Sequence, residues 1–524
     1  MRRTLRQEGL VDQHLLQGLR IAVVDDGVGT SALRGEINQL AEHLGVESPE
    51  EYVSGSSVHD FLICIGDSCV PNSDTPYTRV QILDDGVRMT SDIDSESGVP
   101  SSLQEPGLCT IGAALAWQEV LRRTGVTQPV EVPKKYVTVN LRIDPSKMEY
   151  GEDAESSLRL VGPSGEEIPF QSHSRDDGTG HVVLSARLNE GTDLADSILG
   201  SIKLESSEPS QSVHAAEVEF TIPRCEESVS GSVTVAGVGG LGSWAMHTVA
   251  RGVINSGGDG SGLRINLVDP DTEVEIHNLN RQVLYSSDDL GMPKADVSAK
   301  RISAVLPMAE VRGYVDAIGL PHLDGLVNPE EIEENRELDE EDEGVEFIDG
   351  FTDRVGFSAD FLDAIKSTDA VLCGVDNLRS RSVLSAISSH LGIPMINAGA
   401  RGFVGSFDVF LDDLTCMICR YGTHAIAQHR PMSCQEDGEV PFSSIVTSTA
   451  LFGALEGLAL ISALGSDASS SLVDWPSHIT WSGWSNSFDC HADHSFGPFK
   501  QVFLAKGGHS EHLAHLLFDA EVSS

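Results

Sequence analysis

The pattern of hydrophobic and polar positions divides the chain into four parts. The first part, residues 1–126, contains two apolar, β-branched runs at 19–24 and 61–65, which are typical of buried parallel strands. Stretches with helical periodicity lie at 31–44 and 111–122. The first part therefore predicts a short α/β unit.

The second part, residues 127–224, has a different pattern. Short runs of alternating apolar and polar residues are separated by turns rich in Gly, Asp and Ser, as in antiparallel sheets. We expect a small, sandwich-like all-β domain, with strands at 136–143, 157–161, 181–188, 202–204 and 216–222.

The third part, residues 225–466, returns to alternating strands and helices, and residues 467–524 form a mixed C-terminal segment. The acidic stretch 330–343 is interpreted as a solvated insertion. The apolar run 446–465 is long enough to span a bilayer, but it is diluted by hydroxyl and glycine residues and contains Glu456. It therefore predicts a buried helix rather than a membrane span.

Composition narrows the classes of function. The chain of 524 residues carries 35 Lys and Arg against 80 Asp and Glu, a net charge of −45. Nucleic acids and anionic membranes require a basic surface, so neither is an expected partner. Only nine of the cations are lysine, and the acidic residues are spread along the whole chain. This favours a halophile protein, adapted to molar salt, over one with a single basic partner.

Cysteine usage and the N-terminal residues bear on the compartment. Nine cysteines in a chain of this length are too few, and odd in number, for a disulfide scaffold. The basic N-terminal residues are not followed by the apolar core of a signal peptide. We therefore expect a cytoplasmic protein.

The third part begins with a glycine-rich turn between a strand and a helix. The apolar run 232–236 leads into a GxGxxG motif, and 243–253 then has helical character. Glycines let the backbone approach phosphates, and the helix start offers free N–H groups. The motif glycines are Gly237, Gly239, Gly240 and Gly242. Taken alone, the motif predicts a dinucleotide oxidoreductase, or a turn that packs helix on strand without any ligand.

The residues that follow do not fit a dehydrogenase. They supply two cations for phosphate oxygens, an amide donor and a carboxylate for magnesium, as phosphate chemistry requires. These residues are Arg281, Lys294, Asn278 and Asp376. Asp269 directly follows the next predicted strand, at 263–268, and its carboxylate suits ribose hydroxyls. For each charged residue the alternative is an ordinary surface ion pair.

In order, these motifs read GxGxxG, D-x-D-x-x-V, N-x-N-R-Q, D-x-G-x-x-K and D-N-x-x-x-R. The set strongly resembles the ubiquitin-activating enzyme superfamily, which includes the adenylyltransferases of molybdopterin and thiamine biosynthesis. The resemblance covers about residues 226–465. It implies an α/β, Rossmann-like adenylation domain with a mainly parallel sheet.

The resemblance also implies a reaction and its site. ATP would adenylate the C-terminal glycine carboxylate of a small ubiquitin-like protein and release pyrophosphate. Asn278, Arg281 and Lys294 would hold the phosphates, Asp376 would bind Mg²⁺, and Asp269 the ribose. Asp271 and Asn377 complete the predicted nucleotide-binding set.

A structural zinc site is a further implication of the resemblance. The family combines a CxxC pair with a distant second pair, and two thiolates with a Cys and a His make an acceptable tetrahedral Zn²⁺ site. Here the first pair is Cys416 and Cys419, and the distant partners are Cys490 and His494, with His491 as the alternative fourth ligand.

Cys434 is the candidate nucleophile. It lies in a polar, turn-rich segment between the CxxC pair and the long apolar run, with Arg430 nearby. An exposed thiol whose pKa is lowered by neighbouring cations can attack an acyl-adenylate and form a thioester. The family places its thioester or persulfide cysteine in this loop, although some members carry one there without needing it.

The first α/β unit resembles a shrunken, inactive copy of the adenylation domain. The family begins its adenylation unit with an arginine-rich segment, which is absent before residue 233 but present at the N-terminus. The resemblance therefore assigns Arg6 to the ATP site of the third part, and the alternative is a surface arginine. After the strand at 19–24, acidic residues occupy the glycine loop, so this half is expected to be inactive.

The leading hypothesis is an ATP-dependent activating enzyme for a ubiquitin-like protein, with thioester transfer to Cys434 and hand-off to a conjugating enzyme. The second is a sulfur-carrier adenylyltransferase in which Cys434 is dispensable. The third is an NAD-linked oxidoreductase or a nucleotide-binding scaffold. The two halves would form an intramolecular pseudo-dimer, or the chain would pair with a second copy.

Overall fold

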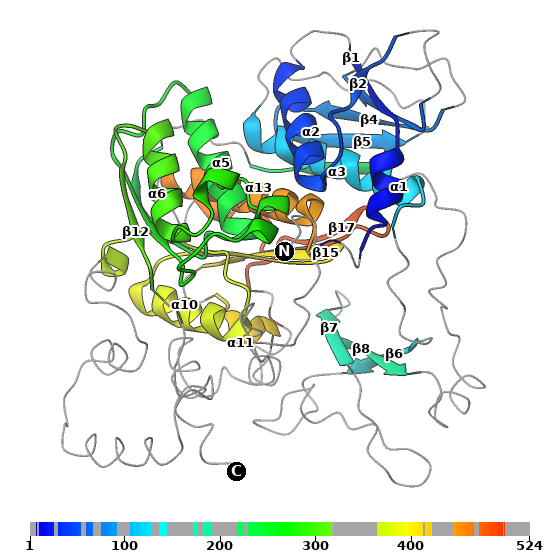
Figure 1. Ribbon diagram of the computed structural model, residues 1–524. Coiled ribbons are helices and arrows are strands. Elements are labelled where there is room, and N and C mark those ends of the chain that lie inside the picture. Colours follow the sequence, from blue (N-terminus) through cyan, green and yellow to red (C-terminus); the bar gives the residue numbers. More distant parts are fainter. Residues whose placement is uncertain are drawn as a thin grey trace, which may run out of the picture.

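The computed structural model contains two α/β sheets whose helices pack against each other, and a small separate sheet (Figure 1). The structure describes residues 7, 10–25, 30–53, 59–66, 75–91, 105–127, 136–143, 171–176, 182–189, 217–223, 229–316, 318, 364–411, 414–421, 444–465, 471–495 and 497.

The N-terminal sheet has six strands in the order β2-β1-β3-β4-β5-β9. The first four are parallel, and β5 and β9 are antiparallel to their neighbours. The strands are β1 (Ile21–Asp25), β2 (Glu50–Glu51), β3 (Phe61–Ile65), β4 (Tyr77–Ile82), β5 (Gly86–Ser91) and β9 (Glu217–Thr221).

Three helices belong to this half: α1 (Gln13–Gly18), α2 (Ser31–Leu44) and α3 (Pro106–Arg123). The α/β prediction for this region is confirmed, and α2 has the bounds that its periodicity indicated. Helix α3 begins earlier than the sequence pattern suggested. Glu105 caps its N-terminus by accepting from the Leu108 N–H at 2.8 Å, and Pro106 suits the first helical position.

Strand β9 is the main difference from the expected division. We placed residues 216–222 in the all-β domain, whereas β9 pairs along its whole length with β5 of the N-terminal sheet. Its alternating pattern explains why: Val218 and Phe220 are buried in the core while Glu219 is exposed. The described part of the all-β region is a three-stranded antiparallel sheet of β6 (Tyr136–Ile143), β8 (Val182–Asn189) and β7 (Gln171–Asp176).

The second sheet has eight strands in the order β12-β11-β10-β13-β14-β15-β16-β17. The first five are parallel, and the rest are antiparallel. The mainly parallel sheet predicted for the third part is therefore confirmed. Its strands are β10 (Gly231–Ala236), β11 (Leu263–Val268), β12 (Glu310–Tyr314), β13 (Ala370–Cys373), β14 (Met395–Arg401), β15 (Val404–Phe410), β16 (His478–Ser482) and β17 (Ser487–His491).

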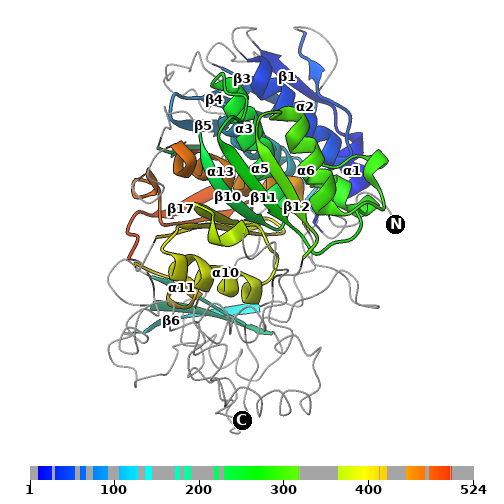
Figure 2. The same ribbon diagram turned by 90° about the vertical axis from the view of Figure 1, so that its left-hand side faces the viewer.

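Helices cover both faces of this sheet. One layer holds α5, α6 and α13, and the opposite layer holds α10 and α11 (Figures 1 and 2). Their bounds are α5 (Gly240–Asn255), α6 (Lys294–Val305), α10 (Leu378–Leu391), α11 (Met417–Tyr421) and α13 (Val446–Gly465), with short 3-10 helices η3 (Ile276–Asn280) and η4 (Ser287–Asp289).

Helix α13 is the apolar run that resembled a membrane span. Residues 446–464 meet the length and hydropathy of a spanning helix, yet that window is fully buried inside the protein. The helix packs against α5, α3 and β14. Its role as a buried core helix, expected from its glycine and hydroxyl residues, is confirmed.

The two sheets share one strand order. In the N-terminal half it is β2-β1-β3-β4-β5-β9, and β11-β10-β13-β14-β15-β16 repeats it with the same parallel and antiparallel neighbours. Helix α2 follows β1 as α5 follows β10, and α3 lies between β5 and β9 as α13 lies between β15 and β16. The N-terminal half thus has the plan of the larger half without its dense nucleotide motifs.

The two halves also pack on each other. Helix α3 lies against α13 and α5, and one hydrophobic core includes residues of both halves. The turn between β16 and β17 is bonded to α3: the Gln118 side-chain amide donates to the Gly483 carbonyl oxygen at 2.9 Å. Phe220 of β9 stacks on Phe488 of β17 at 4.9 Å between ring centroids.

Candidate nucleotide-binding site

The glycine turn after β10 has the geometry that its glycines predict. Gly237 has φ +83°, and a Cβ atom there would lie 2.8 Å from the carbonyl oxygen of Gly374. A Cβ on Gly242 would collide with the carbonyl oxygen of Gly237. Helix α5 begins at Gly240 with no side-chain cap, so its first N–H groups remain for another partner.

Asp269 fixes this turn from the end of β11. Its Oδ2 atom accepts from the Val238 N–H at 2.8 Å, and its Oδ1 accepts from the Asp271 N–H at 3.0 Å. Burial raises the pKa of this carboxyl, and the nearby Lys294 ammonium opposes that rise. The predicted ribose ligand thus lies against the glycine turn, with both oxygens already bonded to backbone.

Lys294 is the first residue of α6 and is 5% exposed. Its Nζ atom forms an ion pair with the half-exposed carboxylate of Asp271. Asp271 therefore neutralises the charge of Lys294, the cation that the motif assigns to phosphate. Because the Asp271 carboxylate is half-exposed, a bound phosphate can replace it as the partner of Lys294.

Asn278 lies in η3 and Arg281 directly follows it, and both residues are buried. The Asn278 side chain accepts from the Glu275 N–H at 2.8 Å, which closes the start of η3. The Arg281 guanidinium donates to the carbonyl oxygen of His277 at 2.9 Å. Its Cδ atom lies 3.9 Å from where a Cβ on Gly240 would stand, so its side chain reaches the start of α5.

Asp376 and Asn377 lie after β13, on the other side of the glycine turn. Asp376 is exposed. Asn377 caps α10 by accepting from the Ser380 N–H at 2.8 Å. The backbone of Gly374 approaches Gly237 and Gly242, so the loop that carries Asp376 begins beside the glycine turn.

Tyr285 is a site residue that the sequence reasoning missed. Its hydroxyl donates to the carbonyl oxygen of Val238 at 2.7 Å and contacts Ser298 Oγ at 2.9 Å. Burial, followed by the charge of Asp269, raises the pKa of Tyr285 well above its usual range. It holds the glycine turn as a neutral donor, and its place four residues after Arg281 was the available signal.

The predicted zinc ligands are only partly brought together. Cys416 and Cys419 are buried with their Sγ atoms 3.6 Å apart. Cys490, however, is exposed on β17, and His494 donates to the carbonyl oxygen of Trp475 at 2.9 Å. In the parts of the chain described above, no three His, Cys, Asp or Glu side chains are grouped to hold a metal ion. The prediction that Cys490 and His494 join the pair is not met there.

Two predicted catalytic residues, Cys434 and Arg6, lie outside the described residues. Gln7, directly after Arg6, is described and buried, and its amide donates to the Leu44 carbonyl oxygen at 2.9 Å. Gln7 therefore lies beside the C-terminal end of α2.

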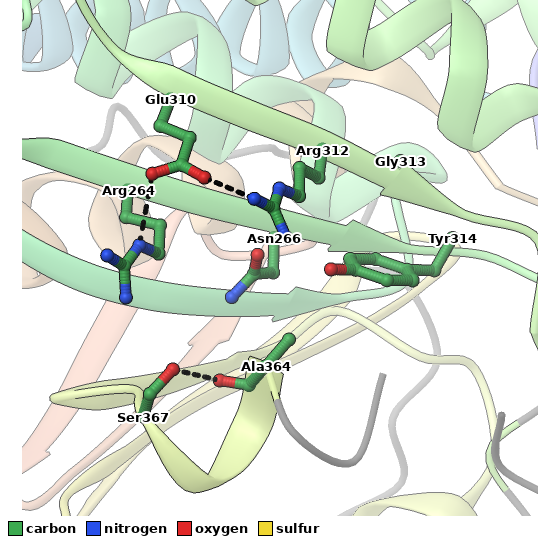
Figure 3. A pocket seen from close by; sticks show the side chains of 8 residues that line it. All are labelled: Arg264, Asn266, Glu310, Arg312, Gly313, Tyr314, Ala364 and Ser367. Carbon is green, nitrogen blue, oxygen red and sulfur yellow. Dashed lines mark hydrogen bonds and ion pairs between the residues drawn. The ribbon is translucent and has the colours of Figure 1, made fainter. Parts of the chain in front are cut away.

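A cavity of about 710 Å³ lies along β11 and β12 (Figure 3). Glu310 pairs there with Arg264 and Arg312. The glycine turn, Arg281 and Lys294 do not line it. Its link to the predicted phosphate site is a backbone bond from the Asp269 N–H to the Tyr314 carbonyl oxygen at 3.1 Å, so the cavity and the phosphate site are separate.

Residues 218–486, just over half of the chain, match the ThiF family. The chain belongs to the ThiF family. The resemblance to the ubiquitin-activating enzyme superfamily is thereby confirmed at the level of the family.

Curated relatives of this ThiF-family chain include two activating enzymes and a sulfur carrier protein adenylyltransferase. It is 28% identical over 194 residues to the NEDD8-activating enzyme E1 catalytic subunit of Arabidopsis thaliana, covering 36% of this chain and 34% of the relative. It is 26% identical over 193 residues to the SAMP-activating enzyme E1 of Haloferax volcanii, covering 37% and 54%. It is 24% identical over 245 residues to the sulfur carrier protein ThiS adenylyltransferase of Escherichia coli, covering 46% and 77%. The chain thus spans only about a third of the Arabidopsis relative.

Solved structures similar to this ThiF-family chain include E. coli MccB with ATP. That match has 17% sequence identity and a TM-score of 0.32, and it covers 50% of this chain and 63% of MccB. E. coli tRNA N6-threonylcarbamoyladenosine dehydratase in complex with ATP matches at 20% identity and a TM-score of 0.29, covering 45% and 85%.

Proposed function

We propose that this chain uses ATP to adenylate the C-terminal glycine carboxylate of a small ubiquitin-like carrier protein. The observation that carries the proposal is the set of groups around the start of α5. Arg281 reaches Gly240, Asp269 holds the glycine turn, and the loop that carries Asp376 begins at Gly374, whose backbone approaches that turn. Membership of the ThiF family supports the same reaction.

The proposed step forms an acyl-phosphate bond. A carboxylate oxygen of the carrier attacks the α-phosphorus of ATP, the bond from that phosphorus to the bridging oxygen breaks, and pyrophosphate leaves with the electron pair. The N–H groups at the start of α5 and the side chains of Asn278, Arg281 and Lys294 would stabilise the negative charge. Asp269 would orient the ribose.

Magnesium belongs to the proposal because the donor set fits it. Mg²⁺ binds through one or two carboxylates and through substrate phosphates, and Asp376 is an exposed carboxylate two residues after Gly374, whose backbone approaches the glycine turn. When bound, the ion would neutralise phosphate charge. This chain's own residues would bind and orient the nucleotide around it.

The adenylation test is carrier-dependent exchange of labelled pyrophosphate into ATP. The probe is a small ubiquitin-fold protein that ends in glycine. Exchange should require the carrier and its terminal glycine, and Asp376→Asn should reduce it at least about 100-fold, the scale of losing one charge-stabilising group. A chain that exchanges nothing with any such carrier, or exchanges equally well without one, contradicts adenylation of a carrier.

We further propose a thioester on Cys434, as in an activating enzyme that hands its carrier to a conjugating enzyme. The alternative is a sulfur-carrier adenylyltransferase that needs no enzyme thioester. The SAMP-activating E1 relative supports the first and the ThiS adenylyltransferase the second.

A thiol-sensitive adduct between chain and carrier separates these two. With ATP present, the adduct should form in the wild type and disappear in Cys434→Ala. Cys490→Ala is the matched control because Cys490 is an exposed thiol on β17. An adduct that persists in Cys434→Ala excludes it as the nucleophile, and its absence in the wild type favours the sulfur-carrier reaction.

We propose that the buried pair Cys416 and Cys419 would supply two of the four ligands of a structural Zn²⁺ ion. Two thiolates bound at about 2.3 Å to one tetrahedral Zn²⁺ lie somewhat less than 4 Å apart, which fits their 3.6 Å separation. Metal analysis of the purified protein should find zinc that is lost in Cys416→Ser and kept in Cys490→Ser. Retention of zinc in Cys416→Ser contradicts this assignment.

Arg6 is proposed as a contribution of the N-terminal half to the same site, within an intramolecular pseudo-dimer. The support is its neighbour Gln7, which is bonded to Leu44 at the end of α2, where α2 contacts η3. Arg6→Ala should lower carrier-dependent exchange while leaving the thermal unfolding midpoint within about 2 °C, the range of a substitution that leaves the core intact. Unchanged exchange in Arg6→Ala would contradict this role and favour the alternative, an ordinary surface arginine.

A further inference from the structure

The C-terminal end of α2 contacts the segment that carries Asn278 and Arg281. His43 is 7% exposed, and its Nδ1 atom lies 2.9 Å from the carbonyl oxygen of Leu279. A carbonyl oxygen only accepts, so Nδ1 carries the proton and donates. This bond joins the N-terminal half to η3 of the other half.

A second donor holds the same stretch of backbone from α5. The Trp244 indole N–H donates to the carbonyl oxygen of Arg281 at 2.9 Å. The His43 and Trp244 rings are in edge contact, with centroids 5.6 Å apart and planes at 67°. The two rings thus pack on each other, and their N–H groups hold the carbonyl groups of Leu279 and Arg281.

These carbonyl groups lie at the end of a 3-10 helix of five residues. So short a helix has few bonds of its own, and its last carbonyl groups need outside partners. The Arg281 guanidinium also bonds within this segment, to the His277 carbonyl oxygen. A shift of the backbone at Leu279 would therefore move the guanidinium away from Gly240.

Glu36 lies two turns before His43 on α2 and contacts α5, the helix that follows the glycine turn. Its buried carboxylate forms an ion pair with Arg251 of α5 and accepts from the Thr110 hydroxyl of α3 at 3.0 Å. Residues seven apart lie on one helix face. One face of α2 therefore contacts both α5, which starts in the glycine turn, and η3.

We propose that His43 is a positioning residue for the nucleotide site of the other half, because its bond to Leu279 sets where Arg281 stands relative to the start of α5. The inference rests on the proposed function for the identity of the ligand, ATP. The positional claim itself concerns the protein without ligand.

The test compares two substitutions of His43. His43→Leu removes the donor and keeps the bulk, whereas His43→Asn keeps an N–H group near the Nδ1 position. Calorimetry with ATP·Mg²⁺ should give a dissociation constant about fivefold higher for His43→Leu, the factor of one ordinary hydrogen bond, and within about twofold of wild type for His43→Asn.

Hydrogen exchange on the free protein supplies the second readout. The N–H groups of Arg281 and Gln282 donate to the carbonyl oxygen of Asn278. They should exchange faster in His43→Leu and normally in His43→Asn. Trp117→Phe is the matched control, since it loses one buried bond, from the indole to the Ile37 carbonyl oxygen, within the N-terminal half.

The outcomes separate the two proposals. If wild-type protein binds ATP·Mg²⁺ and His43→Leu changes neither affinity nor exchange, the positioning role is overturned and the proposed function stands. If Trp117→Phe has the same effects as His43→Leu, a general loss of stability explains them and the positioning role is overturned. If wild type binds no ATP·Mg²⁺ but His43→Leu alone exchanges faster at residues 281 and 282, the function fails and the positioning role stands.

Discussion

Asp408 is a buried charge on β15 with four side-chain partners among the residues that the structure describes. It accepts from Tyr421 at 2.6 Å, from the Asn397 amide at 3.0 Å and from His478 Nδ1 at 2.7 Å. Its opposite neighbours across the strands are Asn397 and His478. The buried Arg420 guanidinium lies 3.5 Å from its Oδ1. This cluster ties β14, β15, β16 and α11 together.

Removing the charge of Asp408 should destabilise the fold strongly. Asp408→Asn would leave the Arg420 guanidinium buried without its counter-charge, so we expect a loss of about 3–5 kcal/mol in the free energy of unfolding, measured by urea denaturation. Glu310→Gln is the control. Its partners Arg264 and Arg312 are about half exposed, so the loss should be below about 1 kcal/mol. Equal losses would contradict a special role for Asp408.

The same residue predicts a pH dependence. Burial opposes ionisation of Asp408, but the charge and hydrogen bond of His478, followed by Arg420 and Tyr421, outweigh it and lower its pKa to about 2. The folded pKa lies below the unfolded value of 3.8. Its contribution is therefore complete above about pH 4 and lost as pH falls towards 2. The stability gap between wild type and Asp408→Asn should close over this range, and a constant gap would contradict the assignment.

Lys294 tests the phosphate site at the residue scale. Lys294→Gln should slow carrier-dependent pyrophosphate exchange about 100-fold, because one charge-stabilising group is lost. Lys300 lies on the same helix α6 and is exposed, so Lys300→Gln should leave the rate within about twofold. Comparable losses in both would point to general electrostatics instead of a local contact.

At the scale of elements, α5 and α13 approach each other over glycines. A Cβ on Gly453 would lie 2.6 Å from the carbonyl oxygen of Leu241, and a Cβ on Gly457 2.6 Å from that of Ala245. Glycines four apart lie on one helix face. The close approach of the two helices therefore depends on residues that, taken alone, weaken a helix.

Alanine at these glycines should reverse its usual effect. Gly457→Ala is expected to lower the free energy of unfolding by about 1–3 kcal/mol through overpacking against α5. Gly35→Ala in α2 is the matched substitution. No atom lies within 4 Å of its Cβ position, so it should stabilise by about 0.5–1 kcal/mol. Stabilisation by both, measured by thermal and urea denaturation, would contradict close packing at Gly457.

At the scale of the whole molecule, the net charge of −45 sets the response to salt. Self-repulsion of like charges destabilises the compact state, and the screening length falls from about 10 Å at 0.1 M salt to about 3 Å at 1 M. Raising KCl from 0.1 to 2 M should therefore raise the thermal midpoint by at least about 5 °C, equivalent to roughly 2 kcal/mol for a domain of 150–250 residues. A midpoint that stays constant or falls would contradict the proposed adaptation to salt.

The nucleotide segments were visible in the sequence because their signals are local. A glycine turn between a strand and a helix needs glycine at Gly237 for its positive φ and at Gly242 for the close approach. Helix α2 has the ends, Ser31 and Leu44, that its 3.6-residue period predicted. The contacts of Tyr285 and Asp408 were not visible, because each side chain bonds to segments distant in the sequence.

The sequence by itself determined the α/β class, helix α2, the strands β1, β3, β10 and β11, and the family motifs, since periodicity and glycine requirements act over a few residues. Only the tertiary structure decided that β9 belongs to the N-terminal sheet, that Cys490 stands apart from the Cys416 pair in the described region, and that α2 contacts η3. The bond between His43 and Leu279 spans 236 positions. Contacts of that kind depend on how the two sheets pack, and no local pattern records them.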